Sequence, residues 1–202
     1  RDDTKAGNYF VSNYPPFSFW GEEDAPCVES LLNSPEPGVA PLGLYYHVPF
    51  CRKRCHFCYF RVYTDKNSSD IRRYLSATMQ ELRQYAERPY VAGRKPKYVY
   101  FGGGTPSYLS AQQLTELTDE MKAIMPWDEA EEVTFECEPG TLTEKKLEVI
   151  KNFGVTRLSL GIENFSDHVL DINGRAHRSP EVYRAYEFAR GLGFDNIIIR
   201  TF

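Results

Sequence analysis

The feature that most constrains the fold of this 202-residue chain is a regular alternation of short apolar runs with longer segments of helical period. The short runs, rich in β-branched and aromatic residues, are 42–48, 97–101, 132–136, 157–161 and 196–199. The segments of helical period between them are 69–87, 110–125, 143–153 and 180–192. Such alternation is typical of βα units whose strands pair in parallel. The sequence therefore predicts an α/β fold, a partial (β/α) barrel with about five βα units.

Two parts of the chain differ in composition. Residues 1–40 are rich in proline, glycine and aromatic residues, and we expect an extended arm that packs on the domain or reaches toward a ligand. Residues 41–202 carry the alternating pattern and form the predicted core. No helical segment follows the last apolar run, and a closed barrel needs more strands, so we expect this core to be truncated at its C-terminal end.

Charge and cysteine content narrow the class of protein. A net charge of −4 gives no broad basic field, so we expect a small-molecule partner and neither nucleic acid nor membrane. There is no apolar run of about 18 residues, and residues 1–5 do not resemble a secretory signal. Of the five cysteines, three lie within eight residues, a spacing that suits a metal better than a disulfide and implies a reducing cytoplasm. We expect Cys27 and Cys137 to be ordinary thiols.

The three clustered cysteines, Cys51, Cys55 and Cys58, form a C-x3-C-x2-C motif directly after the first apolar run. Three thiolates can bind three corners of a 4Fe-4S cubane and leave one iron open to a substrate or cofactor. If that cofactor is S-adenosylmethionine, one electron from the cluster can cleave it to methionine and a 5'-deoxyadenosyl radical. A zinc site of three cysteines with His47 or His56 is the alternative, although this spacing is uncommon for zinc.

Together with the flanking residues, the motif resembles a known family. The run Tyr45-x-His47-x-Pro49-Phe50-Cys51, the triad, and the run Gly102-Gly103-Gly104-Thr105-Pro106-Ser107 are similar to the radical S-adenosylmethionine enzymes of the oxygen-independent coproporphyrinogen III oxidase group. This resemblance extends from about residue 42 to residue 199. It implies a 4Fe-4S cluster bound by Cys51, Cys55 and Cys58, and S-adenosylmethionine as the second cofactor.

The resemblance also implies cofactor contacts for eight further residues. These are Tyr45, Phe57, Gly103, Gly104, Thr105, Glu136, Glu163 and Arg175. Glycines suit such contacts because the missing Cβ lets backbone groups approach a ligand closely. Glu136 could instead be a solvated strand end, and Glu163 stands where the family has a glutamine. We expect His177, which follows Arg175 closely, to be a surface residue at a helix start.

Two positions depart from the oxidase pattern. The oxidases have a fourth cysteine two residues after the last cluster ligand, but this chain has Phe60 there. Heme chaperones and radical methyltransferases share that replacement, so the resemblance alone does not imply oxidase activity. Arg200 stands where the family usually has an aspartate after the fifth strand, and its closeness to the end of the chain leaves open whether the site itself is changed.

Three functions are therefore open. The first is a radical enzyme, an oxidoreductase or methyltransferase, that abstracts hydrogen from a tetrapyrrole or other small molecule and leads to oxidative decarboxylation, methylation or ring closure. It would need an electron donor such as a flavodoxin or ferredoxin. The second is a heme-binding chaperone that keeps the cluster motif without radical turnover. The third is a zinc-stabilised structural domain.

Overall fold

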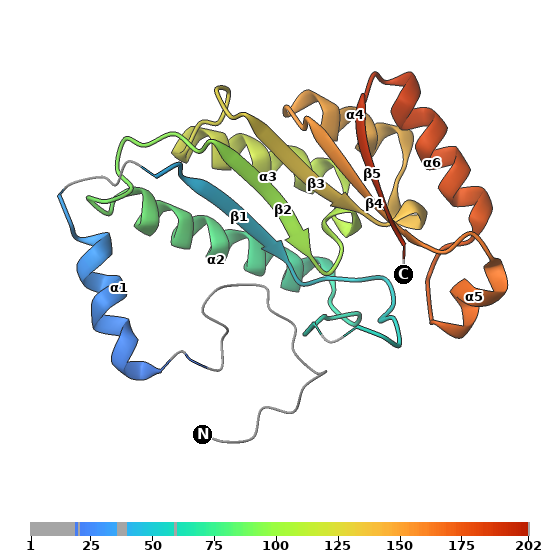
Figure 1. Ribbon diagram of the computed structural model, residues 1–202, viewed down its shortest axis with the longest axis horizontal. Coiled ribbons are helices and arrows are strands. Elements are labelled where there is room, and N and C mark those ends of the chain that lie inside the picture. Colours follow the sequence, from blue (N-terminus) through green and yellow to red (C-terminus); the bar gives the residue numbers. More distant parts are fainter. Residues whose placement is uncertain (1–18, 20, 36–39, 59, 202) are drawn as a thin grey trace.

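Five parallel strands form the centre of the protein (Figure 1). The structure is a computed structural model that describes residues 19, 21–35, 40–58 and 60–201. The strands follow the chain order β1-β2-β3-β4-β5 across the sheet. They are β1 (Gly43–Val48), β2 (Tyr98–Gly103), β3 (Glu132–Cys137), β4 (Arg157–Glu163) and β5 (Asn196–Thr201). Each of the five predicted runs is therefore a strand, and the open sheet confirms the predicted partial barrel.

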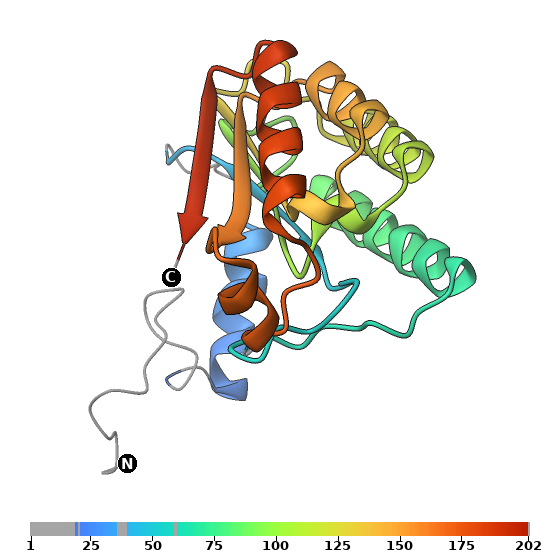
Figure 2. The same cartoon turned by 90° about the vertical axis from the view of Figure 1, so that its right-hand side faces the viewer.

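The helices that connect the strands lie together on one side of the sheet (Figure 2). They are α2 (Ser68–Ala86), α3 (Ala111–Ile124), α4 (Glu144–Asn152) and α6 (Ser179–Gly191). Three begin at side-chain caps: Asn67 Oδ1 accepts from the N–H of Ser69 at 2.8 Å, and Ser110 and Thr143 accept from backbone N–H groups in the next turn. The four predicted helical segments each match one of these helices, with ends that differ by one residue.

The face of the sheet toward these helices is the hydrophobic core. Alternate strand residues point to it, as the period of a strand requires, and Phe101, Phe135, Leu158 and Leu160 are each 0% exposed. The rings of Phe101 and Phe135, on neighbouring strands, pack with centroids 5.4 Å apart. Burying one such side chain contributes about 1.5–3 kcal/mol to the free energy of unfolding.

Two helices lie where the sequence predicted none. Helix α1 (Ala25–Leu32) occupies part of the arm that was expected to be extended, and Glu29 on it forms an ion pair with Arg88 at 2.8 Å. Its apolar side chains are largely exposed, so the sequence lacks the buried stripe that marks a longer helix. Helix α5 (Asp167–Ile172) is only six residues long, too short for a clear period. Residues 1–18, which hold most of the arm's aromatic residues, lie outside the described part, and the boundary after residue 40 stays a prediction.

Short 3₁₀ helices, Glu22–Asp24, Pro106–Tyr108 and Pro139–Thr141, complete the secondary structure. The second and third directly follow β2 and β3, where the site loops begin. Among the described residues, no helix is both long and apolar enough to cross a membrane.

Candidate functional site

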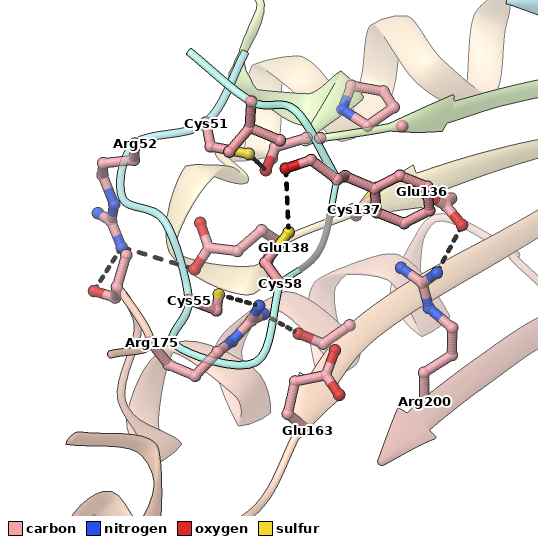
Figure 3. A pocket seen from close by; sticks show the side chains of 18 of the residues that line it. Cys51, Arg52, Cys55, Cys58, Glu136, Cys137, Glu138, Glu163, Arg175 and Arg200 are labelled. Atoms are coloured by element: carbon pink, nitrogen blue, oxygen red, sulfur yellow. Dashed lines mark hydrogen bonds and ion pairs between the residues drawn. The ribbon is translucent and has the colours of Figure 1, made fainter. Parts of the chain in front are cut away.

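A cavity of about 1140 Å³ opens at the carboxyl ends of the strands (Figure 3). Side chains from the loop after β1 and from the ends of the other four strands line it. All eleven residues that the sequence singled out are among them: Tyr45, Cys51, Cys55, Phe57, Cys58, Gly103, Gly104, Thr105, Glu136, Glu163 and Arg175. The fold thus brings together residues up to 130 positions apart in the sequence (175 − 45), because parallel strands all end at the same edge of the sheet.

The first cysteine of the motif is buried against the glycine loop. The Cys51 N–H donates to the carbonyl of Tyr63 at 3.0 Å, which folds the cysteine loop back on itself. The hydroxyl of Thr105 donates to Cys51 Sγ at 3.3 Å. Burial raises the pKa of the Cys51 thiol, and the hydrogen bond from Thr105 opposes that shift. A donor aimed at the sulfur stabilises the thiolate that a metal needs.

The second cysteine has a cationic donor. Arg175, in the segment between α5 and α6, donates from Nη1 to Cys55 Sγ at 3.2 Å and from Nη2 to the carbonyl of Gly161 at 2.5 Å. This places a guanidinium donor directly beside the second sulfur. The third sulfur, Cys58 Sγ, lies 4.0 Å from the carbonyl oxygen of Phe60.

These donors fit a site for thiolates that bind separate irons. In the described part of the chain, no three histidine, cysteine, aspartate or glutamate side chains converge as the ligands of a single ion would. This holds for both histidines of the zinc alternative, whose Nδ1 atoms contact the hydroxyl of Tyr45 (His47, 3.1 Å) and the carbonyl of Ile172 (His56, 2.7 Å). The donor set therefore suits a cluster better than one zinc ion.

The glycine loop is shaped to meet the cysteine loop. The N–H of Gly104 donates to the carbonyl of Val48 at 2.8 Å, and a Cβ on Gly104 would lie 2.9 Å from Cys51 Sγ. Gly103 has a φ of 110°, and a Cβ there would lie 2.7 Å from the ring of His47. Both positions therefore require glycine for packing, in addition to the cofactor contact that the resemblance implies.

On the open face of the sheet, aromatic and charged side chains from β1, β2, β3 and β5 form a connected row. The ring of Tyr45 stacks on Tyr100 with centroids 5.8 Å apart, and the hydroxyl of Tyr100 donates to Glu136 Oε1 at 2.7 Å. Arg200 reaches the same oxygen at 2.5 Å. Burial and the bond to Glu136 raise the pKa of Tyr100. Glu136, with a side chain 12% exposed, is not a solvated strand end, and Arg200 belongs to the cavity wall.

Glu163 ends β4 in an unusual backbone conformation. Its φ of 68° is the only positive value among the non-glycine residues of the described part. A glutamate held in this region costs about 1–3 kcal/mol, and such strain gathers at functional sites. Glu163 lines the cavity beside Gly161, whose missing side chain leaves room for Arg175 and Arg200.

The prediction that His177 lies at the surface is wrong. It is 0% exposed; its Nδ1 lies 2.8 Å from Glu138 Oε1 and its Nε2 lies 3.0 Å from the carbonyl oxygen of Ile162. The second acid of the Glu-Cys-Glu-Pro run, Glu138, was not singled out, and nor was Arg52, which pairs with it at 3.6 Å. Position is their only signal in the sequence. Arg52 directly follows Cys51 in the cysteine loop, and Glu138 directly follows Cys137 at the end of β3.

Comparisons with known proteins identify the family. The model of the Radical SAM superfamily matches residues 45–202. Heme chaperone HemW of Bacillus subtilis is 37% identical over 155 residues, which cover 76% of this chain and 40% of HemW. Oxygen-independent coproporphyrinogen III oxidase of Salmonella typhimurium is 30% identical over 185 residues, which cover 91% of this chain and 39% of the oxidase.

A solved structure has the same fold. Coproporphyrinogen III oxidase HemN from Escherichia coli, described as a radical SAM enzyme, superposes with a TM-score of 0.79 at 28% identity over 94% of this chain and 43% of HemN. The chain spans about two fifths of the length of the curated relatives it matches. The family implies a 4Fe-4S cluster and S-adenosylmethionine. On its motifs, its fold and these matches, the chain belongs to the radical SAM superfamily, in the group that contains HemN and HemW.

Proposed function

We propose that this chain is the cluster- and S-adenosylmethionine-binding part of a radical enzyme that acts on a tetrapyrrole or another small molecule. One observation carries the proposal: three cysteines of one loop line a single cavity with the eight predicted cofactor residues, and two of the sulfurs receive hydrogen bonds from Thr105 and Arg175. When bound, the two cofactors together supply a 5'-deoxyadenosyl radical that can abstract hydrogen.

Each side chain has a binding role in this proposal. Cys51, Cys55 and Cys58 bind three irons as thiolates. The backbone of Gly103 and Gly104 contacts the amino and carboxylate groups of S-adenosylmethionine, because the missing side chains leave the peptide groups accessible. The cavity also offers Glu136 for an amino or hydroxyl group and the fixed donor fork of Arg175 for a carboxylate.

Three further residues flank the cofactor in the proposal. Tyr45 and Phe57 give apolar surface for its organic part, and each is about half exposed toward the open side, at 56% and 45%. Glu163, ionised, accepts hydrogen bonds from ribose hydroxyls but cannot donate them as a glutamine would. We expect binding to cover Tyr45 and Phe57.

Delivery of the electron needs a protein partner. Lys53, Arg54 and Arg61 are exposed on and just after the cysteine loop, in a chain whose net charge is −4. Local positive charge next to the cluster would guide an acidic carrier by electrostatic steering. We propose a flavodoxin or ferredoxin as this donor, in the reducing cytoplasm where free thiols persist.

A heme chaperone is the second candidate. HemW of Bacillus subtilis is 37% identical to this chain, whereas the Salmonella oxidase is 30% identical. Phe60 also replaces the fourth cysteine of the oxidases. Oxidative decarboxylation, methylation and ring closure remain the reactions to distinguish if turnover occurs.

The test uses the full-length protein, reconstituted with iron and sulfide without oxygen. After reduction with dithionite, 5'-deoxyadenosine formed from S-adenosylmethionine is measured by mass spectrometry, with and without coproporphyrinogen III. Substrate-stimulated 5'-deoxyadenosine is the expected result. Stoichiometric heme binding with no 5'-deoxyadenosine supports the chaperone instead, and a colourless zinc protein overturns both.

A further inference from the structure

A polar network lies beneath the cysteine loop and is built from Arg52, Glu138 and His177, three residues that have no role in the proposed function. We propose that Glu138 is a positioning residue. Arg52 connects the cysteine loop to the carboxylate of Glu138, and His177 contacts the same carboxylate. We call Glu138 the anchor of the loop. This inference rests on the proposed function only in naming the cluster as the group that the anchored loop holds.

The anchor itself is rigidly held. Glu138 is 8% exposed and directly follows β3, where its N–H donates to the hydroxyl of Ser107 at 3.0 Å. Its Oε1 accepts from the N–H of Gly140 at 3.2 Å and faces His177 Nδ1 at 2.8 Å. His177 is in turn fixed from its other ring nitrogen by the carbonyl of Ile162 on β4. The carboxylate is thus tied to the ends of two strands.

Arg52 connects the cysteine loop to this anchor. Its Nη2 lies 3.6 Å from Glu138 Oε1 and donates to the carbonyl of Ala176 at 2.6 Å, while Nη1 donates to the carbonyl of Gly140 at 3.3 Å. One guanidinium therefore joins the loop after β1 to the loop after β3 and to the segment between α5 and α6. Lysine cannot make this set of contacts, because it lacks the planar fork.

The contacts bear directly on the sulfurs. Arg52 follows Cys51 in the chain, and Ala176, which accepts from Arg52, follows Arg175. Arg175 donates to Cys55. Fixing Arg52 therefore fixes the loop at Cys51 and, through Ala176, the donor to Cys55. Figure 3 shows the guanidinium of Arg52 joined by a dashed line to the carboxylate of Glu138.

Electrostatics make the anchor dependent on its partners. Burial alone would raise the pKa of Glu138, but the hydrogen bond from His177 and the charge of Arg52 outweigh it, and the pKa is lowered. The carboxylate is therefore ionised in the interior. Its second oxygen, Oε2, has no hydrogen-bond partner among the described residues. Losing either partner leaves a buried charge less compensated, which is costly.

The experiment compares Arg52→Met, Glu138→Gln and the double variant with wild type and with Lys53→Met in the full-length protein. Lys53 is the matched control because it neighbours Arg52 on the same loop, is exposed, and makes no ion pair within the described part of the chain. The first measurement is hydrogen exchange of the amides of residues 51–58 before the cluster is loaded. We expect exchange about tenfold faster in both single variants and unchanged in Lys53→Met.

The second measurement follows the loaded cluster, by the rate of iron release to a chelator and by the electron paramagnetic resonance spectrum with S-adenosylmethionine. We expect faster release and shifted g-values in Arg52→Met and Glu138→Gln, with the double variant no worse than the more affected single one. Amide exchange at the wild-type rate in both single variants would overturn the proposal that Glu138 anchors the loop. Strictly additive effects in the double variant would overturn it as well. A wild-type protein that binds no cluster overturns the proposed function instead, and the exchange data still decide the anchor. If Glu138→Gln unfolds, the partly exposed Arg52→Met decides alone.

Discussion

The two faces of the sheet are made from the same strands and differ in almost every respect. Toward the helices, Phe101 on β2 and Phe135 on β3 are completely buried among apolar neighbours. Toward the open side, their neighbours in the sequence are Tyr100 and Glu136, which line the cavity. The hydroxyl of Tyr100 donates to Glu136, and Glu136 pairs with Arg200. Alternate residues of one strand thus specify fold and function separately, because successive side chains point to opposite faces.

The largest effect is expected from changes to the cysteine loop at the open side of the sheet. Replacing Cys51, Cys55 or Cys58 with Ala should abolish cluster assembly, because each change leaves a second iron without a protein ligand. The fold should persist, since the core lies on the other face. Iron and sulfide content measure cluster assembly, and circular dichroism measures whether the fold persists. Cys27→Ala and Cys137→Ala are the controls, and four irons per chain in a triad variant would refute the assignment.

A change on the closed face, the face covered by the helices, should lower the stability of the fold and leave the cluster site intact. Phe135→Ala removes a fully buried ring and should lower the free energy of unfolding by about 3–5 kcal/mol. Any protein that remains folded should keep its cysteine loop and bind a cluster. Chemical denaturation measures the first effect, and iron content of the folded fraction measures the second. Loss of less than about 1 kcal/mol would mean that the core tolerates the cavity and that the two faces differ less than their burial suggests.

Within the open face, residues that line the cavity should differ from those that do not. Glu136→Gln should weaken S-adenosylmethionine binding about tenfold, because a neutral amide attracts an ammonium group less than a carboxylate does. The melting temperature should change little, since Arg200 is partly exposed and such pairs contribute little.

Glu132→Gln is the matched control for that experiment. Glu132 lies on the same strand and pairs with Arg157 at 2.7 Å, but it does not line the cavity. Isothermal titration should therefore give wild-type affinity for Glu132→Gln. Equal effects of the two variants would mean that the charge of the whole face matters and not the position of Glu136.

The smallest effect is expected at Phe60. Phe60→Cys restores the fourth cysteine of the oxidase pattern, but three thiolates already satisfy three irons, so cluster content and 5'-deoxyadenosine formation should stay near wild type. The change should not create coproporphyrinogen decarboxylation, because placing a substrate depends on many distant groups. Mass spectrometry of the porphyrin products checks this. Robust decarboxylation by the unmodified full-length protein would instead make it an oxidase despite Phe60.

The closed face could be predicted from the sequence because its signals are local. Apolar runs placed all five strands, and the helical period placed the ends of the four connecting helices within one residue. The cysteine and glycine motifs were equally local. Their convergence followed from the rule that parallel strands end at one edge of the sheet.

The anchor could not be predicted in this way, because its contacts join residues far apart in the chain. Arg52 and Ala176 are 124 positions apart, and neither belongs to a motif with a fixed spacing. His177 was assigned to the surface because local rules place polar residues near a helix start in solvent. Its burial depends on Glu138, 39 positions earlier. Only tertiary structure reveals such pairs.

The hydrogen bond from Arg175 to Cys55 has a consequence for the newly made protein. Cys55 emerges from the ribosome 120 residues before the arginine that donates to it. At about 5–20 residues per second, the cysteine loop waits roughly 6–24 seconds without that donor. During this interval Cys55 lacks the contact that Arg175 makes with it in the folded chain. If the chain binds a cluster as we propose, a cluster delivered before Arg175 is translated would meet a site without one of its donors.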